Sequence, residues 1–176
     1  MTLLLLPLAL AASGWPDISV APAPTGGGER DAAVLVGIEN YANLPDITGA
    51  GVNVADWQSW LLRTRGVRPV AISRRLDGDA VDVNIREALH DAVAKVQPGG
   101  TLWVVYVGHG APSDNNAQPM LVGADAQPSP DGIRSRSVFL SEVQQILAEA
   151  PQAHTVLVLD ACFSGQGVDG RELVAE

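Results

Sequence analysis

Residues 155–165, TVLVLDACFSG, contain a short apolar run that stops at a polar turn around the only cysteine, Cys162. Residues 101–110, TLWVVYVGHG, repeat this pattern and stop at His109 between two glycines. Apolar runs of this length, bounded by turn-forming residues, are typical of strands buried on both faces of a sheet. Each run therefore predicts a buried strand that is followed directly by a chemically reactive side chain.

The segments around these two runs alternate between strand and helix patterns. The expected strands are 32–38, 67–73, 101–107 and 155–159, and the expected helices are 49–63, 82–96 and 141–150. Asp82 is expected to cap the second helix, and Ser141 with Gln144 forms a capping box for the third. Residues 111–137 are polar and rich in Pro, Asp and Asn, so a long loop with a short hairpin at 120–122 is expected there.

This alternation predicts an α/β fold with a mostly parallel sheet flanked by helices on both faces. In open sheets of this kind, the ligand crevice lies outside the carboxyl ends of the strands. His109 and Cys162 each follow a strand, so both are expected at that edge.

The size and charge of the chain restrict its function. It has 176 residues and is 47% hydrophobic, which suits one compact domain. The formal net charge of −9 argues against a nucleic-acid partner, because such binding depends on clustered Lys and Arg. A nucleotide-binding domain is also disfavoured, since the residues after the first expected strand, Gly37 to Asn40, match neither phosphate-binding glycine motif.

The amino-terminal residues carry a targeting pattern. Residues 1–12 are almost entirely apolar and end in small residues, which predicts an export signal and a periplasmic or extracellular location. The run is shorter than the roughly 20 residues that span a bilayer, so no stable membrane span is expected. Residues 13–30 are rich in Pro and Gly and predict a linker, which leaves residues 31–176 as the folded domain.

Cys162 and His109 are the residue types that nucleophilic catalysis requires. A thiol attacks an acyl carbon as the thiolate, and the departing amine must receive a proton. Imidazole titrates near neutrality and can serve both steps. Gly110 lets a substrate carbonyl approach the backbone, so its N–H and that of Cys162 are candidate oxyanion donors. The alternative for Cys162 is a buried structural thiol.

At this point the sequence resembles the caspase and metacaspase superfamily of cysteine peptidases. The matching segments are AAVLVGIENY at 32–41, ITGAGVNVADWQSWL at 47–61, WVVYVGHG at 103–110, PMLVGADA at 119–126 and TVLVLDACFSG at 155–165. In caspases the histidine lies about 50 residues before the cysteine, and here the separation is 53 (162 − 109 = 53). The resemblance implies a caspase-like three-layer sandwich with a His109–Cys162 dyad and with the Gly110 backbone in the oxyanion hole.

The resemblance also suggests a specificity pocket. Caspases carry Gln two positions before the nucleophile and cleave after Asp, whereas metacaspase-like members carry Asp there and cleave after Arg or Lys. This chain has Asp160, whose carboxylate suits a cationic substrate side chain. The family's second acidic position, on the first helix, aligns with Asn53, which adds a hydrogen bond but no charge.

The resemblance implies a peptide or protein substrate and no cofactor or metal, although members of the family can require calcium. Asp77 and Asp79 alone offer too few oxygen ligands for calcium. Family domains continue past the nucleophile with two more strands, whereas this sequence ends at Glu176. A partner chain or a missing segment is therefore expected to complete the groove. The alternative function is a catalytically incompetent scaffold that binds a peptide or protein.

Overall fold

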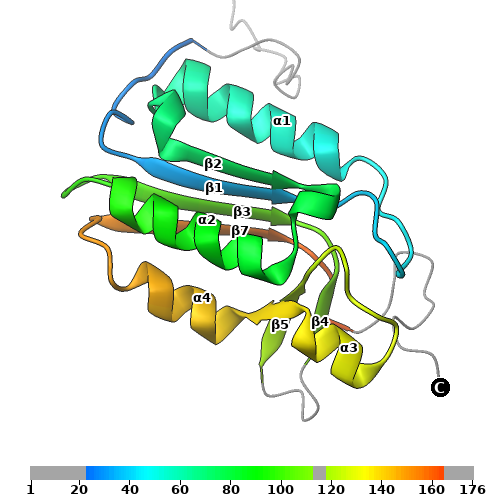
Figure 1. Ribbon diagram of the computed structural model, residues 1–176. Coiled ribbons are helices and arrows are strands. Elements are labelled where there is room, and N and C mark those ends of the chain that lie inside the picture. The colour runs from blue at the N-terminus through cyan, green and yellow to red at the C-terminus, as the bar shows by residue number, and fades with distance from the viewer. Residues whose placement is uncertain (1–22, 113–117, 165–176) are drawn as a thin grey trace, which may run out of the picture.

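A computed structural model describes residues 23–112 and 118–164 (Figure 1). Its main sheet has four parallel strands in the order β2-β1-β3-β7. Their bounds are Ala32–Gly37 for β1, Ile72–Leu76 for β2, Thr101–Val107 for β3 and His154–Asp160 for β7. The predicted parallel α/β sheet is confirmed.

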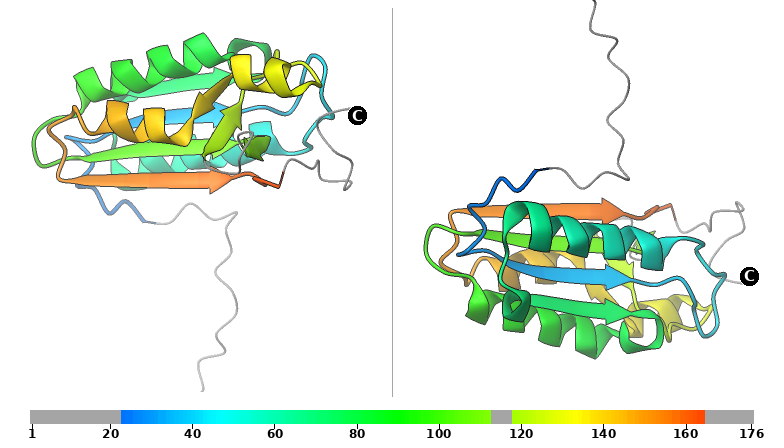
Figure 2. Two further views of the ribbon diagram at one scale, coloured as in Figure 1. Left: turned by 90° about the horizontal axis from the view of Figure 1, so that it is seen from below. Right: turned by 90° about the horizontal axis from the view of Figure 1, so that it is seen from above.

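Helices cover both faces of this sheet (Figure 2). Helix α1 (Ala50–Trp60) lies on one face against β1 and β3 and continues into one π-helical turn, Leu61–Arg65. Helices α2 (Asp82–Lys95) and α4 (Leu140–Leu147) contact each other on the opposite face. None of the helices in the described ranges is long and apolar enough to cross a membrane.

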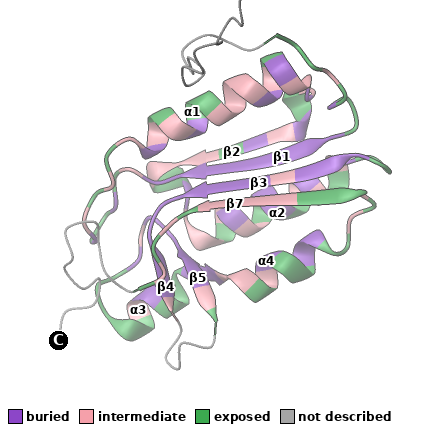
Figure 3. Cartoon of the chain, turned by 180° about the vertical axis from the view of Figure 1, so that it is seen from behind, coloured by how far each residue is buried: buried purple, intermediate pink, exposed green. Residues whose placement is uncertain are grey.

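Burial differs sharply between the central strands and β7 (Figure 3). All six residues of β1 are buried, and so are all residues of β3 except Trp103. Strand β7 is similarly apolar in sequence, but Val156 to Leu159 are only half-buried. Within the described part of the chain β7 pairs with β3 alone, so its second edge lacks the cover that both neighbours give to β3.

The buried Asp31 lies immediately before β1 and links three elements at the amino-terminal end of the sheet. Its carboxylate accepts hydrogen bonds from the Thr101 amide at 2.7 Å and from Trp103 Nε1 at 3.0 Å. It also pairs with Arg65 Nε at 2.9 Å. A buried charge is tolerated where it is paired and fully hydrogen-bonded in this way.

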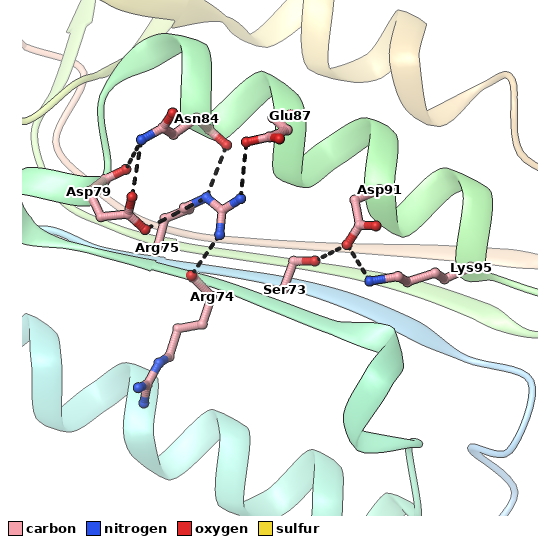
Figure 4. Close-up of polar contacts among 8 residues, drawn as sticks. All are labelled: Ser73, Arg74, Arg75, Asp79, Asn84, Glu87, Asp91 and Lys95. Atoms are coloured by element: carbon pink, nitrogen blue, oxygen red, sulfur yellow. Dashed lines mark hydrogen bonds and ion pairs between the residues drawn. The ribbon is translucent and has the colours of Figure 1, made fainter.

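Strand β2 begins five residues later than the sequence predicted. The apolar stretch from Val67 suggested a strand, but Pro69 starts a 3₁₀ turn, Pro69–Ala71, because proline lacks the N–H that a strand ladder requires. The strand itself reads ISRRL, with Ser73 and Arg75 bonded to α2 and Arg74 directed away from it to Gln58 of α1 (Figure 4). Ser73 and Lys95 both bond to the Asp91 carboxylate, and Arg75 reaches Glu87 at 3.3 Å.

The described part of residues 111–137 is more structured than the predicted loop with its short hairpin. Three antiparallel strands form a second sheet in the order β4-β5-β6, with α3 between β5 and β6. Their bounds are Gly110–Pro112 for β4, Pro119–Val122 for β5, Ser137–Phe139 for β6 and Pro130–Ser135 for α3. Ser129 caps α3 by accepting from the Gly132 amide at 3.1 Å, and Pro130 occupies the first turn, where proline is tolerated.

Two predicted helix caps are wrong. Helix α2 begins at Asp82 after Val81, and the Asp82 carboxylate pairs with Arg86 instead of capping. Helix α4 begins after Phe139, one residue before Ser141, whose hydroxyl donates to Gln118 at 3.1 Å. Asp82 pairs with Arg86 one turn further along the same helix, whereas Ser141 bonds to Gln118, a residue distant in sequence.

The described part of the expected linker lies against the domain. Thr25 N donates to the Thr64 carbonyl at 2.8 Å, and Gly28 N donates to the Arg65 carbonyl at 2.9 Å. The expected export signal and residues 13–22 lie outside the described residues, as do residues 165–176.

Candidate active site

The register of β3 and β7 places His109 and Cys162 at the same edge of the sheet. Val107 pairs with Asp160, and the Gly108 amide donates to the Asp160 carbonyl at 3.2 Å. His109 and Cys162 each lie two residues beyond this paired position. The two residues therefore leave adjacent parallel strands together, as expected from the sequence.

His109 is buried and its ring is oriented by the loop that follows β1. Its side chain contacts the Pro45 carbonyl oxygen through Nε2 at 2.7 Å. A carbonyl oxygen can only accept, so Nε2 carries the proton, and in the neutral ring Nδ1 is left as the acceptor. The Tyr41 ring lies 4.7 Å from the imidazole, centroid to centroid. Sequence reasoning missed both contacts.

Cys162 has an exposed side chain just beyond β7. Exposure makes the thiol accessible to a substrate, and it excludes a buried structural thiol. The main chain of Cys162 and the side chain of Phe163 pack against Gly110 of β4. The turn that follows β7 therefore contacts the segment that follows β3.

The amide of Gly110 points away from its neighbouring strand. Val122 N donates to the His109 carbonyl at 3.0 Å, so His109 and Val122 form a hydrogen-bonded position of the β4–β5 ladder. Such positions alternate in antiparallel pairs, and Gly110, opposite Leu121, occupies the non-bonded one. Its N–H is therefore directed away from β5.

We expect Gly110→Ala to lower peptide hydrolysis by about a hundredfold, the scale of a displacement of about 1 Å at a reactive group. A Cβ at this position would lie 2.6 Å from Phe163 Cδ1 and 2.9 Å from the Cys162 carbonyl oxygen, so the Cys162 turn must shift. The measurement is kcat/KM on a peptide substrate. Gly78→Ala is the matched control, because a Cβ there meets open space, and equal activity of the two variants would contradict this account of Gly110.

Asp160 and Asn53 lie side by side although they are far apart in sequence. Asn53 Nδ2 donates to Asp160 Oδ2 at 3.1 Å. Asp160 is the exposed last residue of β7, and Asn53 lies in the first turn of α1. The start of α1 is held in turn by Glu39, whose carboxylate accepts from the Gly51 amide at 3.2 Å. The site thus has one carboxylate and one amide at the position suggested for substrate binding.

Asp77, which follows β2, binds the backbone of the loop after β1. Its carboxylate accepts hydrogen bonds from the amides of Glu39 and Asn40 at 2.8 and 2.9 Å. Asp77 itself adopts a left-handed conformation with φ of 44°. Among the residues that the structure describes, no group of three or more His, Cys, Asp or Glu side chains is placed to hold a metal ion.

Comparison with known proteins adds to this geometry. Residues 31–171 match the family model of the metacaspase, peptidase C14 domain. The chain belongs to this metacaspase family. The resemblance inferred from the sequence segments is confirmed, and with it the caspase-like fold class.

Two known proteins illustrate the relationship. Metacaspase-1 of Eremothecium gossypii is 26% identical over 146 residues, which are 78% of this chain and 32% of that protein. The crystal structure of protein GSU0716 from Geobacter sulfurreducens superposes with a TM-score of 0.56 at 14% identity, over 81% of this chain and 52% of that one. The metacaspase chain described here thus spans about a third of the curated relative and about half of the structural one.

Proposed function

We propose that the protein is a cysteine endopeptidase in which His109 and Cys162 form the catalytic dyad. The observation that carries the proposal is their in-register placement after the paired strands β3 and β7 of a metacaspase domain. The exposed thiol and the ring held by Pro45 give a nucleophile and a base at one edge of the sheet. Membership of the family favours hydrolysis of a peptide bond over other acyl transfers.

The proposed reaction begins when His109 Nδ1 takes the proton from the Cys162 thiol. The thiolate attacks the scissile carbonyl carbon, and the oxyanion accepts hydrogen bonds from the amides of Gly110 and Cys162. Nδ1 then gives its proton to the leaving amine as the carbon–nitrogen bond breaks and a thioester remains. Water attacks the thioester, Nδ1 takes a proton from it, and the proton returns to sulfur as the acid product leaves.

Asp160 is proposed to bind the side chain that precedes the scissile bond and to favour Arg or Lys. Its exposed carboxylate beside Asn53 offers one negative charge and one amide. A guanidinium could form charge-assisted hydrogen bonds with the carboxylate, whereas an aspartate side chain would be repelled. Because Asn53 is neutral, the preference rests on Asp160 alone.

We expect kcat/KM to be higher for a peptide with Arg before the scissile bond than for matched peptides with citrulline or Asp. Asp160→Asn should lower kcat/KM for the Arg peptide by about 10- to 100-fold, the equivalent of a lost charged hydrogen bond of about 1.5–3 kcal/mol. The citrulline peptide has the same shape without the charge, so its hydrolysis should change little. Preference for Asp, or an unchanged Arg-to-citrulline ratio in Asp160→Asn, would show that Asp160 does not select the substrate.

The exposed edge of β7 supports a further part of the proposal. Its apolar residues Val156 to Leu159 are half-buried, and among the described residues β7 is paired along one edge only. An apolar sheet edge of this kind is a ready template for another strand. We propose that additional polypeptide, from this protein or a partner, covers β7 and completes the substrate groove.

A further inference from the structure

The β4–β5 ladder departs from regular pairing at His109. In a regular hydrogen-bonded pair, the His109 amide would donate to the Val122 carbonyl, since Val122 N already donates to His109. Instead, the His109 amide donates to the Tyr41 hydroxyl at 2.7 Å. The Val122 carbonyl accepts from the Tyr106 hydroxyl at 2.8 Å. Two tyrosine hydroxyls thus stand where one backbone hydrogen bond is expected.

The same two hydroxyls surround the backbone of His109 on both sides. Tyr106 also approaches the His109 carbonyl oxygen at 2.7 Å, so its single proton is shared between two carbonyls. Tyr41 adds ring contact with the imidazole at a tilt of 47°. The amide, the carbonyl and the ring of His109 are therefore all contacted by this pair, which we name the tyrosine wedge (Tyr41 and Tyr106).

Gly108 provides the space that the tyrosine wedge occupies. A Cβ at Gly108 would lie 2.7 Å from the Tyr106 hydroxyl oxygen and 2.8 Å from that of Tyr41. Real Cβ atoms do not approach other atoms so closely. A glycine directly before His109 thus allows two hydroxyls from separate parts of the chain to meet at its backbone.

Both hydroxyls are deeply buried, with Tyr41 8% exposed and Tyr106 fully enclosed. Burial raises the pKa of each phenol well above its ordinary value, because the charged phenolate is poorly solvated there. The hydroxyls keep their protons at any pH at which a His109–Cys162 pair would operate. They act as fixed hydrogen-bonding groups and not as acids or bases.

We propose that Tyr41 and Tyr106 are positioning residues that hold His109 where proton exchange with Cys162 requires it. The inference rests on the proposed peptidase function. The wedge replaces one of the two backbone hydrogen bonds of the His109–Val122 pair, so the place of His109 is set by two side-chain hydroxyls together with the remaining bond from Val122 N. A proton-transfer group that moves by about 1 Å can lose about a hundredfold in rate. Small changes at the wedge should therefore affect turnover more than substrate binding.

The test uses Tyr41→Phe, Tyr106→Phe and the double variant of the full chain. Tyr41→Phe keeps the ring against the imidazole and removes only the oxygen that accepts the His109 amide. Each single variant is expected to lower kcat by about 10- to 100-fold with KM within about twofold. The double variant should lose less than the product of the two single losses, because both hydroxyls act on one group.

Ser73→Ala is the matched control for loss of a buried hydroxyl. Ser73 is 8% exposed, as Tyr41 is, and its hydroxyl donates to Asp91 at the opposite edge of the sheet. This variant should lower Tm to a similar extent as the tyrosine variants and leave kcat unchanged. If the tyrosine variants match it, with lower Tm and wild-type kcat, the hydroxyls serve stability alone and the inference is overturned.

A second measurement tests the effect of His109 on the Cys162 thiol and needs no peptide substrate. The rate of Cys162 alkylation by iodoacetamide at neutral pH is measured in wild type, His109→Ala and the tyrosine variants. A His109 placed to take the thiol proton should make wild type react faster than His109→Ala, and the tyrosine variants should react at rates closer to that of His109→Ala. If wild type and His109→Ala react equally fast, the proposed dyad itself fails. If the tyrosine variants react as fast as wild type while His109→Ala reacts more slowly, the dyad stands and the tyrosine wedge is refuted.

Discussion

Replacement of Cys162 by alanine is expected to abolish peptide hydrolysis, with a loss in kcat of at least about a thousandfold, while Tm stays at the wild-type value. The rate falls because the attacking sulfur is gone and the remaining site can only polarise the carbonyl. The fold is retained because the thiol is exposed and is not part of the core. The measurement pairs kcat on an Arg peptide with thermal unfolding of the same sample.

His109→Ala should lose activity on the same scale, and His90→Ala is its matched control. His90 is an exposed residue of α2 and lies on no strand end. Hydrolysis that survives in purified Cys162→Ala would mean that another group is the nucleophile. Equal activity of the two histidine variants would remove His109 from the mechanism.

Asp31→Ala is expected to produce the largest loss of stability, about 3–5 kcal/mol in the free energy of unfolding. The substitution leaves the Arg65 charge, the Thr101 amide and the Trp103 indole N–H without their acceptor. Asp31 is fully buried, so water does not readily replace it. Urea unfolding of the full chain measures the change.

Asp56→Ala is the control for Asp31, since Asp56 is an exposed acid on α1 and its loss should change the free energy of unfolding by no more than about 0.5 kcal/mol. A loss below about 1 kcal/mol for Asp31→Ala would contradict the role assigned to its hydrogen bonds. Asp31 lies at the opposite end of β1 from the candidate active site. Asp31→Ala should therefore lower the free energy of unfolding and leave the kcat of the folded protein unchanged.

The central strands were predictable from sequence because both of their faces are buried. Strand β3 has the bounds 101–107 that its apolar run indicated. Edge strand β2 was misplaced, since its polar side chains make a weak strand signal and the apolar residues before it form a turn. A short hairpin at 120–122 was expected, but the full three-stranded sheet β4-β5-β6 was not, because its strands have only three or four residues, too few for an alternation pattern to be recognised.

The residues of the candidate site were found through motifs, and their neighbours were not. His109, Cys162 and Gly110 stand in recognisable turns, and their proposed roles stay predictions. Pro45 contributes a backbone carbonyl from 64 residues away, and every residue type has that group, so no sequence signal marks it. Tyr41 resembled a loop residue, and its contact with His109 depends on the path of the chain after β1.

The hydrogen bond between Asn53 and Asp160 is another contact that the sequence motifs did not reveal. The family motifs identified each residue, but the 3.1 Å hydrogen bond joins positions 107 residues apart. It arises because the start of α1 and the end of β7 meet at the carboxyl edge of the sheet. Only the order of the parallel strands brings these positions together.

The most direct test of the His109–Cys162 dyad is covalent labelling by a peptide that carries Arg next to a thiol-reactive group, followed by intact-mass measurement and peptide mapping. We predict one adduct on Cys162 in wild type, formed at least about a hundredfold more slowly in His109→Ala and more slowly with a matched Asp probe. A scaffold that only binds peptides would leave Cys162 unmodified, and labelling of wild type and His109→Ala at equal rates would contradict the dyad.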